Sequence, residues 1–233
     1  MADSIEPRLG SLHLEDLAIV ALTARSGASI VRYPQLDEER RARLRARIKQ
    51  LSRHNWPTST GEDPMLRRGY TLRQCCRLLV ALQMLDAHIV PSLAVPIASA
   101  NEWALLRYMV PQMVRAGKAA EGSRLPPSSA IAVLLLGELV ATVAPDVWQF
   151  AQPQQLRFVP EVQVAELWSP SAGLAHAGQR LALDVGTAAA AAWRWLLDRD
   201  LMPPTTLEQL AADVDQASEL PGYEAKPAIS LRR

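Results

Sequence analysis

The sequence predicts a mostly helical N-terminal domain followed by a smaller α+β domain. Apolar residues recur at helical spacing through most of the first 110 residues or so. A stretch rich in Gly, Ser and Pro then interrupts this pattern, and beyond it short runs of alternating polarity indicate strands. We therefore expect a domain over residues 1–114, a linker over 115–127, a second domain over 128–220 and a flexible tail over 221–233.

Length and composition are those of a folded protein without membrane spans. The chain has 233 residues, of which 49 % are hydrophobic, enough for two small cores. The most apolar run, Ser128 to Ala144, is shorter than the roughly 20 residues that a transmembrane helix needs. The first 15 residues lack the pattern of a secretory signal, and the two cysteines are adjacent within a helical pattern. We expect reduced, buried thiols and a cytoplasmic protein.

Three helices are expected in the first 86 residues. The first begins near Leu12 and stops before Gly27, a typical C-terminal residue. The second spans Asp37 to His54, with acidic residues at its start and a narrow apolar stripe of Leu44, Ile48 and Leu51. The third begins at Thr71, because Thr71 and Gln74 have the spacing of a capping box, and it continues through Leu85.

A fourth helix is expected over Ser92 to Tyr108, disturbed in its first turns by Pro96. The segment before the third helix, Trp56 to Tyr70, is rich in Gly and Pro and is expected to be a loop or a short hairpin.

The second half mixes strands and helices. Periodicity leaves open whether Ile131 to Val143 is a helix or a strand. Alternating polarity predicts strands at 156–159, 162–167 and 180–185. Thr187 is the expected N-cap of an alanine-rich helix that reaches Asp198. A second capping box, at Thr205 and Glu208, predicts a final amphipathic helix.

Positive charge is concentrated in one segment of the chain. Between Arg40 and Arg77 there are 11 of the 25 Lys and Arg residues but only two acids, Glu62 and Asp63, which makes 11 − 2 = +9. The whole chain carries +1, so the remainder carries 1 − 9 = −8. A concentrated positive field of this kind indicates a polyanionic partner, whereas the alternative is a solvated charged helix.

One segment resembles a known family. Arg67-Arg68-Gly69-Tyr70-Thr71-Leu72, a helix through Leu85, a short turn, and Leu93-Ala94-Val95-Pro96-Ile97 with Trp103 resemble the wing and following helix pair of MerR-type winged helix-turn-helix regulators. Leu14 to Ala18 and Arg32-Tyr33 resemble that family's first helices more faintly.

The resemblance implies that the N-terminal domain is a winged helix-turn-helix domain. The helix from Asp37 to His54 would then read DNA, and Arg67, Arg68 and Tyr70 would form the wing that holds phosphates. Charge and resemblance together give the expected DNA-binding residues: Arg41, Arg43, Arg45, Arg47, Lys49, Arg53, Arg67, Arg68, Tyr70, Arg73 and Arg77.

Patterns typical of catalysis and of cofactor binding are missing. Cys75 and Cys76 lack the spacer that lets two thiolates reach one zinc, and neither phosphate-binding glycine fingerprint occurs. Asp184 to Thr187 leads into a helix N-terminus with a single glycine, a weak anion-site signal. Trp193 and Trp195 point to different sides of one helix, so one of them is expected to be partly exposed. We expect no enzyme activity, cofactor or metal.

The sequence as a whole predicts a bacterial, nucleoid-associated transcription regulator that binds double-stranded DNA sequence-specifically. The second domain is expected to serve self-association, giving a homo-oligomer such as a homodimer, or contact with the transcription machinery. The alternative is a non-enzymatic adaptor whose basic helix docks on an acidic protein.

Overall fold

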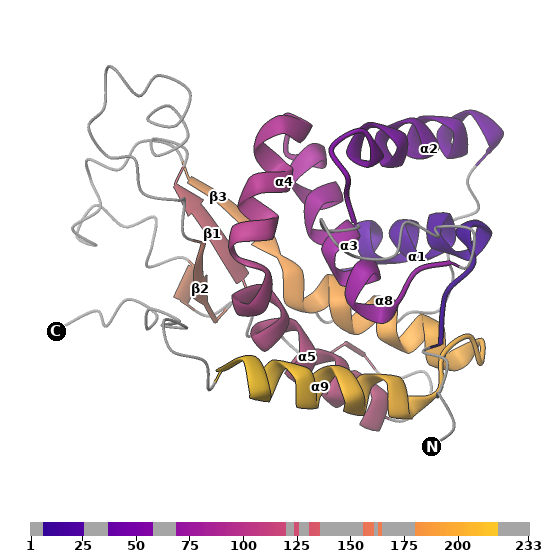
Figure 1. Cartoon of the computed structure of the whole chain (residues 1–233), viewed down its shortest axis with the longest axis vertical. Helices are drawn as coiled ribbons and strands as arrows, with labels where there is room; N and C mark the ends of the chain where they lie inside the picture. Colours follow the sequence, from indigo (N-terminus) through magenta and orange to yellow (C-terminus); the bar gives the residue numbers. More distant parts are fainter. Residues whose placement is uncertain are drawn as a thin grey trace, which may run out of the picture.

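A computed structural model shows a helical protein with a small antiparallel sheet. It describes residues 7–25, 37–57, 69–119, 124–125, 131–135, 156–160, 163–164 and 180–218. The sheet lies at one side of these residues, and the helices pack together on the other side (Figure 1). The predicted combination of a mostly helical chain with a smaller α+β part is confirmed at this level. Within the described residues, no helix has the length and apolar character needed to cross a membrane.

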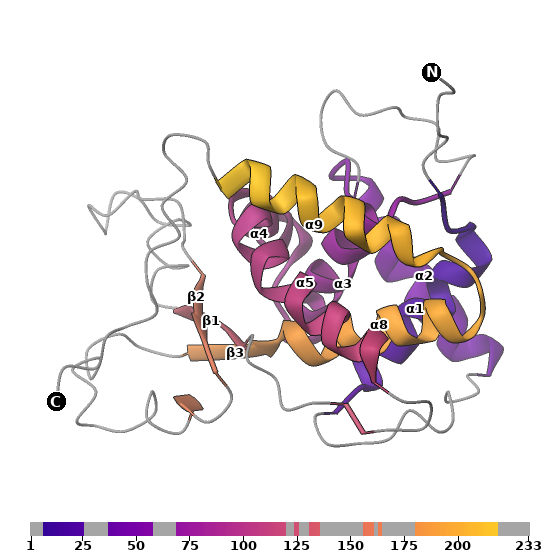
Figure 2. The same cartoon turned by 90° about the horizontal axis from the view of Figure 1, so that it is seen from below.

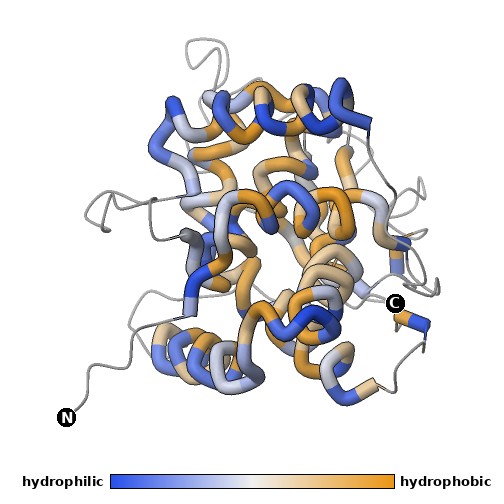
Figure 3. The backbone as a smooth tube through the Cα atoms, turned by 90° about the vertical axis from the view of Figure 1, so that its right-hand side faces the viewer, coloured by the Kyte–Doolittle hydropathy of each residue, from blue (hydrophilic) through white to orange (hydrophobic). Residues whose placement is uncertain are grey.

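The first three predicted helices are confirmed. They are α1 (Ser11–Thr23), α2 (Glu38–Ser52) and α3 (Leu72–Asp86). The capping box of α3 forms as predicted: the Gln74 amide donates to Thr71 Oγ1 at 3.2 Å, and the Thr71 amide donates to Gln74 Oε1 at 3.1 Å. Along several helices, each turn contains both hydrophilic and hydrophobic residues (Figure 3), as expected for helices with one buried side.

The fourth prediction, one helix over Ser92 to Tyr108, is wrong. Two helices form instead, α4 (Pro91–Ala100) and α5 (Glu102–Lys118), and the chain breaks at Asn101. The Asn101 side chain stabilises the break, because its Nδ2 donates to Ile97 O at 2.8 Å and its Oδ1 accepts from the Leu156 amide at 3.1 Å. The disturbance expected at Pro96 is absent, since α4 continues through this residue.

The ambiguity between helix and strand after the predicted linker is settled for residues 131–135, which form a strand; residues 136–143 lie outside the described ranges. Strand β1 (Ile131–Leu135) is central, and β2 (Arg157–Val159) and β3 (Arg180–Asp184) pair with it in antiparallel orientation. Both edge strands match predicted strands. The third predicted strand, 162–167, is not seen in its two described residues, because Gln163 and Val164 are helical; its other residues lie outside the described ranges.

Strand β3 runs directly into helix α8 (Val185–Asp198) (Figure 1). The prediction of Thr187 as the N-cap is wrong: Asp184 is the cap, and its Oδ1 accepts from the Thr187 amide at 2.8 Å. Helix α9 (Pro204–Ser218) begins at Pro204, so the predicted cap Thr205 is already helical. In both cases a residue upstream starts the helix earlier than the capping pattern indicates.

One hydrophobic core extends across the predicted domain boundary. Helix α8 packs against α1 and α5, and the buried cluster runs from Leu9 to Val214. Figure 2 shows α8 beside α5 and α1 from a second direction. Residues 115–118 of the predicted linker are the last turn of α5; most of 119–127, and all of the predicted tail 221–233, lie outside the described residues. The two predicted domains thus share their packing.

Two tryptophans show how closely α5 and α8 pack. Trp193 and Trp195 are both only 1 % exposed, so the expectation that one is partly exposed is wrong. Their two sides of α8 are both covered, because α8 lies between other helices. Between them in sequence, Arg194 Nη1 donates to the carbonyl of Ala119 at 2.6 Å and so satisfies the C-terminal end of α5.

Candidate nucleic-acid interface

Helix α2 lies at the periphery of the protein, at the upper right of Figure 1. It is attached by the predicted apolar stripe, in which Leu44 and Leu51 are buried and Ile48 is partly buried. Most of its other described side chains are exposed. The exposed side chains opposite this stripe form a surface that we call the outer face of α2. They are Ala42, Arg43, Arg45, Ala46, Arg47, Lys49, Gln50 and Arg53. Arg53 lies one residue beyond the end of the helix.

The outer face of α2 has three parallel rows, because residues four apart lie one above the other on a helix. The central row is Ala42, Ala46 and Gln50. On one side lies the row of Arg43 and Arg47, and on the other side lies the row of Arg45, Lys49 and Arg53. Two rows of positive charge thus flank a row of mostly small side chains.

Arg43, Arg45 and Arg47 of the outer face each have a carboxylate neighbour that is itself exposed. Arg43 pairs with Glu39, and both side chains are 74 % exposed. Arg45 pairs with Glu38, whose hydrogen bond raises the pKa of Arg45. Arg47 Nη1 lies 3.3 Å from Asp86 Oδ1. Exposed pairs of this kind contribute little to stability, so a polyanion can replace them at little cost.

Lys49 and Arg53 are exposed at the C-terminal end of α2. Among the described residues, neither side chain has an ion-pair partner. The predicted interface therefore has its least neutralised charge at this end of the helix.

Arg41 does not belong to the outer face. Its Nη2 donates to Asp16 Oδ1 at 2.9 Å, and its Nη1 lies 3.8 Å from Glu15 Oε2. Both acids are on α1, and Glu15 is also 3.7 Å from Arg45. Arg41 thus links α2 to α1, a role that its sequence position among other arginines does not reveal.

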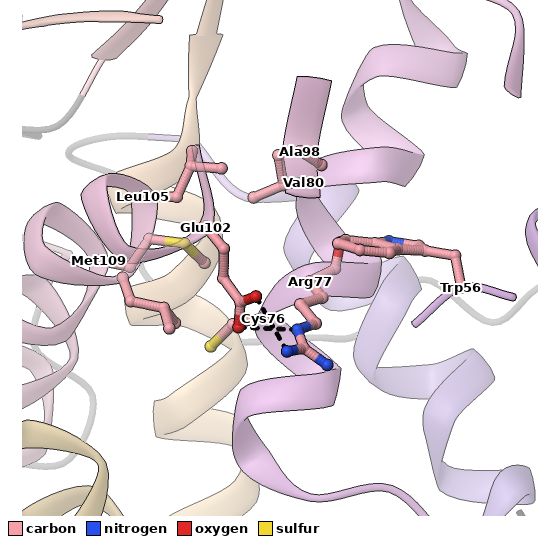
Figure 4. Close-up of a pocket in the computed structure, with 9 residues that line it drawn as sticks. Trp56, Cys76, Arg77, Val80, Ala98, Glu102, Leu105 and Met109 are labelled. Atoms are coloured by element: carbon pink, nitrogen blue, oxygen red, sulfur yellow. Dashed lines mark hydrogen bonds and ion pairs between the residues drawn. The ribbon is translucent and has the colours of Figure 1, made fainter. Parts of the chain in front are cut away.

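Two more of the predicted DNA-binding residues, Tyr70 and Arg77, are buried, and Arg73 is partly buried. Tyr70 is buried, and its backbone exchanges two hydrogen bonds of 2.8 Å with Leu9. Arg73 and Arg77 both pair with Glu102 on α5. Arg77 is only 4 % exposed, and its contact with Glu102 is shown in Figure 4. Arg67 and Arg68, the predicted wing arginines, lie outside the described residues. Of the predicted set, the structure thus brings together Arg43, Arg45, Arg47, Lys49 and Arg53.

The buried cluster around Arg77 is held by charge and hydrogen bonds. Arg77 Nε and Nη2 donate to the two carboxylate oxygens of Glu102 at 2.8 and 2.9 Å, and its Nη1 donates to Pro57 O at 3.1 Å. Trp56 Nε1 donates to the Arg77 carbonyl at 3.0 Å. Arg73 Nε also reaches Glu102, and its guanidinium lies 4.2 Å from the centre of the Trp103 ring. The bidentate pair of Arg77 and Glu102 fixes α3 to α5. The hydrogen bond from Arg77 to the Pro57 carbonyl fixes α3 to the segment after α2.

Sequence reasoning missed the role of Glu102. Glu102 follows Arg77 by 25 residues, and no short-range spacing connects the two. The sequence offers no signal for this pairing, because Asp63 and Asp86 both lie closer to Arg77 along the chain than Glu102 does. Because the pair forms only when α3 and α5 pack, Arg73 and Arg77 were assigned to DNA on charge alone.

A small cavity beside this cluster does not suit an organic ligand. Its volume is about 10 Å³, and its lining includes Cys76, Arg77, Glu102 and Met109. That volume is about the size of one water molecule, whereas ligand pockets are typically about 300 Å³ or larger.

The two cysteines are free and buried, as predicted. Burial raises the pKa of Cys76 to about 12, with the negative charge of Glu102 as a second cause, and burial likewise raises the pKa of Cys75. Burial also raises the pKa of Tyr70. At neutral pH both thiols are therefore protonated and poor nucleophiles.

These pKa shifts predict a loss of stability at alkaline pH. A thiol with an unfolded pKa near 9 and a folded pKa near 12 contributes fully below pH 9, and its contribution falls as pH rises from 9 to 12. For each such group we expect the free energy of unfolding to fall by up to about 1.4 kcal/mol per pH unit in this window. Urea unfolding between about pH 8 and pH 10.5, under reducing conditions, measures this decline in the free energy of unfolding. Cys76→Ala should make the decline shallower; an equal slope would contradict the assignment to Cys76.

No group of three or more His, Cys, Asp or Glu side chains is placed to hold a metal ion in the described part of the chain. The candidate interface thus consists of the outer face of α2. No family model, curated protein or solved structure matches this chain. The winged helix-turn-helix assignment therefore remains a prediction from the sequence.

Proposed function

We propose that this protein binds duplex DNA through the outer face of α2. The observation that carries the proposal is the arrangement of five exposed cationic side chains in two rows, with Ala42, Ala46 and Gln50 between them. From residue 38 to residue 53 there are seven Arg or Lys and two Glu, which makes 7 − 2 = +5. A face with this much charge of one sign is complementary to a phosphate backbone.

The row pattern suits the major groove of B-form DNA. The groove is about 12 Å wide, and a helix with its side chains is about 10 to 12 Å in diameter. Small central residues such as Ala42 and Ala46 let the helix backbone approach the groove floor. The two cationic rows then extend toward the phosphates of opposite strands, where arginine and lysine fix the position of the protein.

Protein contacts on the other side of α2 leave this face available. Leu44, Ile48 and Leu51 occupy the opposite side, and Arg41 holds α2 to α1. The acids Glu38 and Glu39 lie in the first turn, so the C-terminal part with Lys49 and Arg53 makes the closest phosphate contacts. We propose further that the bound protein regulates transcription, a step supported by the resemblance of residues 67–106 to MerR-type regulators.

Salt-dependent binding to duplex DNA tests the proposal. Each phosphate contact contributes about −0.9 to the slope of log affinity against log salt concentration. We expect the double variant Lys49→Gln/Arg53→Gln to bind duplex DNA more weakly than the wild-type protein. We also expect its slope to be shallower by about two, because two contacts are lost. Fluorescence anisotropy with a labelled duplex between about 50 and 200 mM salt measures both quantities.

Arg107→Gln is the matched control, because Arg107 is an exposed cation on a different helix, α5. It should leave the slope unchanged. Absence of duplex binding at low salt, or equal slopes for the double variant and the control, would overturn the proposal. Retained binding to an acidic protein in that case would instead identify an adaptor.

A further inference from the structure

The outer face of α2 contains a single exposed side-chain amide, Gln50, at the end of its central row. Its neighbours in that row, Ala42 and Ala46, have only methyl groups. Ser52, the other uncharged polar residue near this end of α2, already donates its hydroxyl to the Ile48 carbonyl at 3.1 Å. Gln50 is therefore the side chain of this face that has both a free donor and a free acceptor within the described residues.

We propose that Gln50 selects an adenine in the DNA target, an inference that rests on the proposed function. Glutamine forms two hydrogen bonds with adenine in the major groove, donating to N7 and accepting from the N6 amino group. The other base pairs do not present this adjacent acceptor and donor in the same arrangement. The position of Gln50 between two cationic rows places its amide where a helix in the groove meets base edges.

The remaining residues of the face have other roles in this arrangement. Arg43 and Arg47 on one side, and Arg45, Lys49 and Arg53 on the other, contact phosphates and give affinity that is largely independent of sequence. Ala42 and Ala46 supply apolar contact, which suits the C5-methyl group of thymine. Sequence preference at one base pair thus depends on Gln50, whereas salt dependence depends on the flanking rows.

Selection from a random duplex pool tests this division. The full-length wild-type protein, Gln50→Ala and Gln50→Glu are each used to enrich binding sequences at a salt concentration that suppresses non-specific binding. We expect an adenine at one position of the wild-type site, loss of that preference for Gln50→Ala, and a shift toward cytosine for Gln50→Glu, because a carboxylate accepts from the cytosine amino group. On the selected site, Gln50→Ala should bind on the order of tenfold more weakly, with an unchanged salt slope.

Gln216→Ala is the matched control, since Gln216 is an exposed glutamine on α9. It should keep the wild-type preference. If Gln50→Ala enriches the same sequence as the wild type, or if the wild type enriches no sequence although it binds duplex DNA, Gln50 does not read a base and the proposed function still stands. If the wild-type protein binds no duplex at low salt, both proposals fall.

Discussion

Replacing Glu102 with alanine is expected to lower the free energy of unfolding by about 3 to 5 kcal/mol. Arg77 would remain in the core without the carboxylate that its Nε and Nη2 contact, because its side chain is only 2 % exposed. Arg73 would lose the same carboxylate. Urea unfolding followed by tryptophan fluorescence measures the change. Trp56 lies beside Arg77, so its fluorescence also reports on the surroundings of the replaced carboxylate.

Glu39→Ala is the control for this experiment, because Glu39 pairs with Arg43 on the exposed side of α2. Its cost should stay below about 1 kcal/mol. The double variant Arg77→Met/Glu102→Met should recover most of the loss, since removing both charges leaves no buried ion without a partner. A cost for Glu102→Ala no larger than that for Glu39→Ala would show that Arg77 is solvated once the carboxylate is gone.

Replacing Trp193 with alanine is expected to cost about 3 to 5 kcal/mol, and to reverse the effect of a second substitution at Gly117. A Cβ at Gly117 would lie 3.0 Å from Trp193 Nε1 and 3.4 Å from Leu197 Cδ1. In the wild-type background, Gly117→Ala should therefore be destabilising by about 1 kcal/mol, because the strain exceeds the gain in helix propensity. In the Trp193→Ala background, the same substitution should stabilise by about 1 kcal/mol, since the strain is removed.

The four unfolding free energies form a double-mutant cycle that measures the coupling between α5 and α8. Gly10→Ala is the control, because a Cβ at Gly10 meets no atom within 4 Å. It should show the same small effect with and without Trp193. An effect of Gly117→Ala that does not depend on Trp193 would contradict the close approach of the two helices at this residue.

Gly117 illustrates a limit of sequence reasoning. Among Lys, Ser and Pro it is typical of a linker, yet it lies in the last turn of α5, where a Cβ would lie only 3.0 Å from Trp193 Nε1. The local sequence does not distinguish a glycine that is needed for chain flexibility from a glycine that is needed for close packing. The partner that distinguishes them is 76 residues away along the chain.

The candidate interface was predictable where it depends on local spacing and unpredictable where it depends on distant partners. The apolar stripe of α2 fixes which side of the helix is buried, so the exposure of Arg43, Arg47 and Lys49 follows from local spacing. Arg73 and Arg77 also lie beside a helix with a clear apolar face, but their surroundings are set by Glu102. Charge alone does not show whether an arginine meets solvent, DNA or a buried carboxylate.

The sequence by itself determined the features that depend on neighbouring residues: α1, α2 and α3, the capping box at Thr71, strands β2 and β3, and the cationic character of α2. Only the tertiary structure decided the strand at Ile131, the break at Asn101, the burial of both tryptophans, the pairing of Arg77 with Glu102 and the main core shared by both halves of the chain. The physical reason is the distance along the chain over which each interaction acts. Helix caps and periodicity act over a few residues, whereas burial and ion pairing in a core join atoms that become neighbours only when the chain folds.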